Sequence, residues 1–202
     1  MTNTEVVTGE VRFSYAFLFK PHAAQVGNEE KYSVTCLLPK SDVATKALID
    51  AAVKEAITAG AQSKWNGVVP PNVATPIHDG DSVKQDGNPY PEEYKGHWVF
   101  TISSKADYPP QIVDTNNMPL PETDMYSGCY GRVLFNCYPY FFAGKKGIGF
   151  GLKAVLKTRE GEPLAGTVVN TSEAFGLPNN NPFTQQAAAP NTGINPITGL
   201  PN

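Results

Sequence analysis

The chain has 202 residues, of which 41% are hydrophobic and 17% charged, which suits one domain with a sizeable core and leaves room for no second large one. Its 18 glycines and 18 prolines favour many turns and short strands and argue against a helical bundle. No run of 18 uncharged apolar residues occurs, and the N-terminus lacks a basic start followed by an apolar stretch, so we expect a cytoplasmic protein without a membrane span.

The net charge of −3 argues at first against a polyanionic partner, because nucleic-acid binding draws on lysine and arginine. The distribution of charge reverses that conclusion. Residues 126–159 carry six basic residues and no acidic one, a local charge of +6, whereas residues 76–125 carry nine acidic residues and three lysines, a local charge of −6. A chain with charge segregated in this way can present one basic face.

Two β-strands are predicted near the N-terminus. Residues 11–19 place an apolar or aromatic side chain at every odd position, which is the period of a strand with one buried face. Residues 31–38 are rich in β-forming side chains and lie between a charged loop and Pro39. We expect this second strand to pair with the first.

One long amphipathic helix is predicted after these strands. We expect Ser41 to cap its first turn and Gly60 to end it. Apolar residues recur at steps of three and four, with charged residues on the other side, so the helix should cover a core. The apolar positions are Ala44, Leu48, Ile49, Ala52, Val53, Ala56 and Ile57.

The rest of the chain is predicted to be strands, loops and a tail. Residues 62–96 form a long irregular segment rich in proline, glycine and aspartate, which is unusual unless it has a function. Strands are expected at 98–105, 131–142 and 147–157, the last two joined as a hairpin. Residues 175–202 contain no charged residue, so we expect a disordered tail after a single domain of residues 1–174.

The predicted strand 131–142 places aromatic and cationic side chains on one face. Val133, Phe135 and Cys137 alternate toward the core, which leaves a cation and two tyrosines facing outward. Unpaired bases offer flat faces for stacking and phosphates favour a positive groove, so this pattern is typical of a site for single-stranded nucleic acid. The predicted DNA-binding residues are Arg132, Tyr138, Tyr140, Lys145, Lys146, Lys153, Lys105 and Trp65.

An alternative remains open for each tyrosine. Tyr138 or Tyr140, taken alone, is equally compatible with an ordinary core position beneath the helix or the long loop. The next strand is expected to face three residues outward and three inward: Lys153, Val155 and Lys157 outward, and Ile148, Phe150 and Leu152 inward.

Catalytic and metal sites find little support. Asp79-Gly80-Asp81 is compatible with a metal-dependent nuclease, but such a cluster in a loop rich in proline and glycine is more often a solvated turn. No nucleophile motif is present, and the histidines have no spacing suited to zinc. We therefore expect no enzyme, metal or cofactor. The histidines are His22, His78 and His97.

The three cysteines and the glycines of residues 147–151 are predicted to have structural roles. Cys36, Cys129 and Cys137 lie in apolar segments without metal-ligand spacing, so we expect buried free thiols in a reducing compartment. The glycines of residues 147–151 lie inside a strand rather than before a helix, which excludes a dinucleotide fingerprint and suggests that they permit the coiling of a small barrel.

Residues 9–166 resemble a phage and prophage family once known only as a domain of unknown function (DUF2815). The matching segments, in order, are VRFSYA (11–16), KYSV (31–34), LPKSD (38–42), HDGD (78–81), GHW (96–98), SSK (103–105), YSGCYG (126–131), GKKGIG (144–149) and GEPL (161–164). Members of that family are regarded as phage single-stranded DNA-binding proteins with an OB fold, broadly similar to the replication protein of T7-like phages.

The resemblance implies a mainly β, five-stranded OB-fold barrel with one long helix and extended loops. It also implies non-catalytic coating of single-stranded DNA during phage replication or recombination, and contacts with other phage replication proteins. Two features depart from common OB proteins: no acidic residue follows Glu173, and the helix follows the second strand. A homo-oligomer and a structural phage component remain open alternatives.

Overall fold

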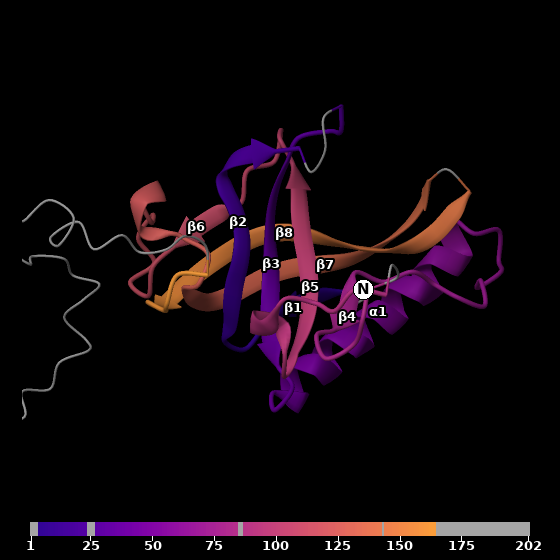
Figure 1. Ribbon diagram of the computed structural model, residues 1–202. Coiled ribbons are helices and arrows are strands. Elements are labelled where there is room, and N and C mark those ends of the chain that lie inside the picture. Colours follow the sequence, from indigo (N-terminus) through magenta and orange to yellow (C-terminus); the bar gives the residue numbers. More distant parts are fainter. Residues whose placement is uncertain (1–3, 24–26, 85–86, 143, 165–202) are drawn as a thin grey trace, which may run out of the picture. The chain divides into compact units, whose positions relative to one another are not determined.

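Eight strands in one sheet and one long helix form the regular part of residues 4–23, 27–84, 87–142 and 144–164, which the computed structural model describes (Figure 1). The prediction of a mainly β chain with one long helix is therefore confirmed. The predicted tail, residues 175–202, lies outside the described residues. No helix in the described ranges is long and apolar enough to cross a membrane.

The five predicted strands are all present. They are β2 (Val11–His22), β3 (Lys31–Pro39), β5 (His97–Lys105), β7 (Tyr130–Phe142) and β8 (Lys145–Arg159). Sequence alternation missed the short elements, because three residues are too few to show a period. These are the strands β1 (Glu5–Val7), β4 (Ile77–Asp79) and β6 (Gln111–Val113), and the 3₁₀ helices η1 (Glu92–Tyr94) and η2 (Glu122–Asp124).

The long strands are joined into a continuous path. β2 pairs with β3, β3 with β5 and β7 with β8, all antiparallel, and β8 meets β5 in parallel at Gly151 and Ser103. β7 also pairs with β2 through Val11 and Gly131, so the pairing returns to its starting strand. The short strands extend the sheet: β1 pairs with β7, β4 with β5 and β6 with β8.

The core is built from the inward residues of these strands. Phe100, Phe135 and Phe150 pack together, with ring centroids 4.8 to 5.9 Å apart. The three cysteines are free and buried, as predicted. Burial raises the pKa of the Cys137 thiol to about 12, so it stays protonated at neutral pH.

The helix α1 (Val43–Ser63) packs against β7 and β1, with two differences from its predicted ends. Asp42, not Ser41, is the N-cap, and its side chain accepts a hydrogen bond from the Thr45 backbone N–H at 2.9 Å. Gly60 lies inside the helix rather than ending it. A Cβ atom at this position would lie 2.7 Å from Cβ of Pro139. The glycine permits close packing of the helix on β7.

One face of α1 also differs from the prediction. Ile49, Ala52 and Ala56 are buried as expected, but Leu48 is 57% exposed. Thr45 takes a buried position because its hydroxyl accepts a hydrogen bond from the Gly9 backbone N–H at 2.8 Å. The helix therefore covers a narrower apolar stripe than its sequence suggests.

Candidate nucleic-acid interface

The β7–β8 hairpin extends beyond the other strands, and its end is called here the arm, residues 137–142 and 144–150 (Figure 1). Tyr138 is directly opposite Gly149, and Tyr140 is opposite Gly147. A Cβ atom at Gly149 would lie 2.5 Å from the Tyr138 ring, and one at Gly147 would lie 2.5 Å from the Tyr140 hydroxyl. The glycines therefore leave room for the tyrosine rings to lie across the neighbouring strand, a role beyond the strand coiling that we expected of them.

The two tyrosines lie on the outward face, as predicted, and not in the core. Tyr138 is 41% exposed and Tyr140 is half-buried, while Cys137 between Asn136 and Tyr138 is buried. The same alternation continues to Phe142, which is 79% exposed and pairs with Lys145. Our sequence reasoning missed this third ring, although its spacing of two residues from Tyr140 was the available signal.

Small side chains continue this outward face across β8, β5 and β3. Thr101 is exposed and Ser103 half-buried, whereas Phe100 and Ile102 between and beside them are buried. Ser103 is the residue that meets Gly151 of β8. We call the outward row of small residues the small-residue floor; it consists of Ser33, Thr101, Ser103, Gly149 and Gly151. Thr35 of β3, which pairs with Thr101, is only 7% exposed and is left out.

Aromatic residues of β2 lie on the far side of the small-residue floor. Tyr15 is 56% exposed and Phe17, which pairs with Ser33, is 36% exposed. The Phe17 ring stacks on His22 with centroids 4.4 Å apart. Our prediction that every odd position of this strand is buried is wrong here, because a register shift between Ser14 and Phe17 turns the strand and buries Leu18 instead.

A second bulge changes the predicted faces of β8. Leu134 pairs with Ala154 and Phe135 with Leu152, so Lys153 is an extra residue between two ladder positions. Lys153 remains exposed, but beyond it the alternation is inverted. Val155 and Lys157, predicted to face outward, are 0% and 7% exposed.

The predicted cations differ in how far they are already engaged. Lys153 forms an ion pair of 2.8 Å with Glu5, and Lys105 lies 3.8 Å from Glu29. The Arg132 side chain is exposed, and its Nε donates to the Thr8 carbonyl at 2.7 Å. By contrast, Lys145 forms no ion pair within the described ranges.

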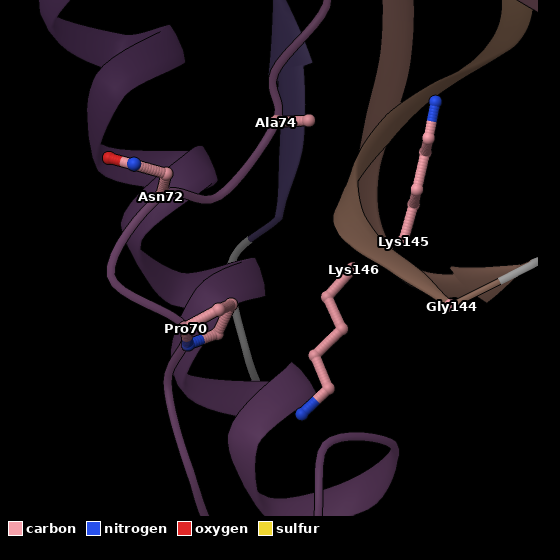
Figure 2. A pocket seen from close by; sticks show the side chains of 6 residues that line it. All are labelled: Pro70, Asn72, Ala74, Gly144, Lys145 and Lys146. Atoms are coloured by element: carbon pink, nitrogen blue, oxygen red, sulfur yellow. The ribbon is translucent and has the colours of Figure 1, made fainter.

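Lys145 and Lys146 point in opposite directions from the arm, on either side of a shallow pocket that Pro70, Asn72, Ala74 and Gly144 also line (Figure 2). Lys145 is opposite Phe142, on the tyrosine side. Lys146 is opposite Phe141, and its Nζ lies 3.4 Å from the Trp65 carbonyl oxygen. Adjacent residues of a strand face opposite sides, so only Lys145 shares a face with the tyrosines.

Trp65 is not placed on a surface. Its side chain is fully buried, and its indole N–H donates to the Tyr140 carbonyl at 3.1 Å. The ring is part of the core between α1 and the arm. Our assignment of Trp65 to a DNA-binding surface is therefore wrong, since a buried ring offers no face to a base.

The carboxylates of the predicted turn at residues 79–81 are engaged by a lysine. Lys40 Nζ lies 2.5 Å from both Asp79 Oδ1 and Asp81 Oδ2. Hydrogen bonds from Lys40 lower the pKa of both carboxyl groups below their ordinary values. Among the residues that the structure places, no group of three or more His, Cys, Asp or Glu side chains is arranged to hold a metal ion.

Comparisons with known proteins give a family and a set of solved structures. The family model described as "Enterobacter phage Enc34, ssDNA-binding protein" matches residues 4–186. The single-stranded DNA-binding protein of bacteriophage Enc34, solved in complex with ssDNA, is 26% identical with a TM-score of 0.68, over 80% of this chain and 90% of that one. A second structure of the Enc34 protein has a TM-score of 0.64 at 26% identity, and the match covers 85% of this chain and 90% of that one.

A more distant structure shares the fold. The single-stranded DNA-binding protein gp2.5 of bacteriophage T7 has a TM-score of 0.56 at 16% identity, and the match covers 88% of this chain and 96% of that one. A search of curated proteins found no match.

Proposed function

The chain belongs to the family of the Enterobacter phage Enc34 single-stranded DNA-binding protein, and from this premise we propose that it binds single-stranded DNA without catalysing a reaction on it. The Enc34 protein, 26% identical, has been solved in complex with ssDNA. In an infected cell the chain would coat and protect single strands exposed during phage replication or recombination, in the host cytoplasm and in contact with other phage replication proteins.

The observation that carries this proposal is one outward face with aromatic rings on both sides of the small-residue floor. Tyr138, Tyr140 and Phe142 lie on one side of the floor, and Tyr15 and Phe17 lie on the other. Bases stack on aromatic rings with about 1–3 kcal/mol each, independent of sequence. Small side chains between the rings would let a single DNA strand approach the sheet closely.

Cations surround this face at its edges. Lys145 lies at the arm, Lys153 and Arg132 follow on β8 and β7, and Lys105 lies at the end of β5. These four are the proposed phosphate contacts, because lysine and arginine neutralise the backbone without selecting a sequence. We leave Lys146 and Trp65 out of the proposed face.

The fold supports the same use. We propose that the five strands β2, β3, β5, β8 and β7, whose pairing returns to β2, form a barrel of the OB type. OB folds bind oligonucleotides on the outer face of the sheet and the loops beside it. The small-residue floor lies on this outer face.

The proposal is tested by fluorescence anisotropy with labelled single-stranded and duplex oligonucleotides at two salt concentrations, with Mg²⁺ and with a chelator. We expect binding that prefers single strands, weakens as salt rises and does not depend on Mg²⁺. A gel of the same samples should show intact DNA. Cleavage would support the nuclease interpretation instead, and absence of binding would contradict the proposed function.

Variants locate the binding face in the same assay. Tyr138→Ala and Tyr140→Ala should each weaken binding to a short oligonucleotide by about 1–3 kcal/mol, while Tyr138→Phe and Tyr140→Phe retain most of it because the ring remains. Tyr108→Ala is the matched control, since Tyr108 is 69% exposed but lies in the loop between β5 and β6. Equal effects of Tyr138→Ala and Tyr108→Ala would remove the tyrosines from the site.

A further inference from the structure

The side of the arm opposite the tyrosines carries an exposed apolar patch. Phe141 is 56% exposed, and Val68 and Val69 are 62% and 50% exposed. The Val68 backbone N–H and Lys146 Nζ both lie within hydrogen-bond distance of the Trp65 carbonyl oxygen, at 3.2 and 3.4 Å. These contacts join the loop after α1 to the hairpin. We call Val68, Val69, Phe141 and Lys146 the arm patch.

The arm patch has features of a contact surface. Three apolar side chains are exposed in segments that these contacts and the Phe141–Lys146 pairing bring near one lysine, and Lys146 forms no ion pair with any acid that the structure describes. Contiguous exposed apolar groups rimmed by polar residues mark interaction sites. The strand alternation turns the patch away from the proposed DNA face.

The opposite end of the hairpin has complementary chemistry. Residues 106–124 contain four acidic residues and no lysine or arginine, a net charge of −4. Glu122 forms an ion pair with Lys20 at 3.0 Å, whereas Asp107 and Asp124 are exposed and form no ion pair within the described ranges. Tyr108 and Met118, 69% and 60% exposed, add apolar surface. We call residues 106–124 the acidic end.

The arm patch and the acidic end are too far apart to meet within one molecule. β6, inside the acidic end, pairs with β8 at Val155, so the part of β8 from Lys146 to Val155 separates them. At about 3.3 Å per residue this is a distance of roughly 30 Å along a continuous strand. Figure 1 shows the hairpin tip and β6 at opposite ends of β8. The two surfaces therefore cannot pair within one copy of the chain.

We propose that copies of this chain associate head to tail, with the arm patch of one copy docked on the acidic end of the next. The contact joins different surfaces, so it does not close into a two-fold dimer and can continue as a row. Lysine meets carboxylate and exposed apolar groups meet each other, which gives a small, salt-sensitive and weak contact. The contact itself does not need DNA.

A consequence of this contact rests on the proposed function. Copies bound side by side on one strand have a high effective concentration, so a weak contact between them becomes cooperative binding. The patch and the DNA face lie on opposite sides of the arm, so one copy can use both at once. Long single strands should therefore be filled cooperatively, whereas an oligonucleotide that holds one copy should not report the contact.

Charge reversal in matched variants tests the proposal. Lys146→Glu changes the arm patch, and Asp107→Lys with Asp124→Lys changes the acidic end. We measure sedimentation of the full chain without DNA at rising concentration and low salt, and cooperativity on long poly(dT). Each variant alone should weaken self-association by about fivefold, the scale of reversing an exposed charge contact. An equimolar mixture of the two variants should restore it, because the reversed charges attract again.

The outcomes separate the two proposals. Restoration in the mixture supports the head-to-tail contact, and it would do so in sedimentation even if the chain bound no DNA. Unchanged sedimentation and cooperativity in both single variants, or no restoration in the mixture, would overturn it and leave the arm patch to a different protein. Affinity for a short oligonucleotide should stay within twofold of wild type in Lys146→Glu, so a loss there would instead assign Lys146 to DNA.

Discussion

The two ends of strand β8 use their basic residues differently. At the end near β6, Lys153, Lys157 and Arg159 each lie within 3 Å of a carboxylate: those of Glu5, Glu160 and Glu10. At the arm, Lys145 and Lys146 form no ion pair within the described part of the chain. A basic segment of the sequence is thus divided into cations that a carboxylate engages and cations that no described carboxylate engages.

Lys157 is the clearest structural cation. Its side chain is buried, and Nζ donates to the Asp124 carbonyl and, at 2.5 Å, to Glu160 Oε1. It thereby ties η2 and the segment after β8 to the strand. Although partial burial raises the pKa of Glu160, hydrogen bonds from Lys157 and Tyr126 lower it more, so the carboxylate stays charged at neutral pH.

Replacing Lys157 should have the largest effect. Lys157→Met should lower the free energy of unfolding by about 2–3 kcal/mol, because the Asp124 carbonyl and Glu160 lose a charged donor. Urea denaturation measures this loss. Lys153→Met is the matched control, and since Lys153 and Glu5 are both about half exposed it should change stability by less than about 1 kcal/mol. Equal losses in the two variants would show that burial does not distinguish the contribution of Lys157 from that of the exposed Lys153.

The positions of the long strands could be predicted from the sequence, but which side chains face inward could be predicted only in part. Four of the long strands and the helix show clear periods, and β3 was recognised by its β-forming residues without a clean alternation, so their positions were predictable. Bulges were not, because neither Lys153 nor the shift between Ser14 and Phe17 is marked by glycine or proline. A single extra residue exchanges the inward and outward sets beyond it, which misplaced Val155 and Lys157.

The candidate face was predictable only where one strand sufficed. The outward positions of Tyr138 and Tyr140 follow from the alternation of β7 alone. The small-residue floor depends on pairing among β3, β5 and β8, which no local pattern reveals. Trp65 is a similar case, since its burial depends on contact between the loop after α1 and the distant Tyr140 backbone.

The available cations should control the salt dependence of single-strand binding. Lys145→Gln should lower affinity and reduce the slope of log K against log salt by about 0.7, the value for one phosphate contact on a single strand. Lys153→Gln should reduce the slope less, because Glu5 already engages that lysine at 2.8 Å. Titrations at four salt concentrations measure the slopes.

Releasing an engaged cation should have the opposite effect. Glu5→Gln removes the partner of Lys153 and should steepen the slope toward one further phosphate contact. Identical slopes in Lys145→Gln, Lys153→Gln and wild type would show that neither lysine contacts phosphate.

The smallest expected effect concerns Lys40 and the pH dependence of stability. Its ammonium donates to Asp79 and Asp81 at the surface and lies 5.2 Å from the centroid of Trp98. Because Lys40 lowers the pKa of both carboxyl groups in the folded chain, the unfolded chain, with aspartate pKa of about 3.9, binds protons first as pH falls. The stabilisation is therefore fully present above about pH 5 and is lost as pH falls through the folded pKa values.

In Lys40→Met the pKa of both aspartates should rise toward the unfolded value, since the hydrogen-bonding cation is gone. Stability at pH 7 should fall by less than in Lys157→Met because these groups are exposed to solvent, and the further loss between pH 5 and pH 3 should be smaller than in wild type. Carboxyl NMR titration gives the pKa values, and urea denaturation at both pH values gives the stability. Equal losses between pH 5 and pH 3 in the two proteins would mean that Lys40 is as available to ligands as the lysines of the arm, and the division drawn from β8 would then not extend to the rest of the surface.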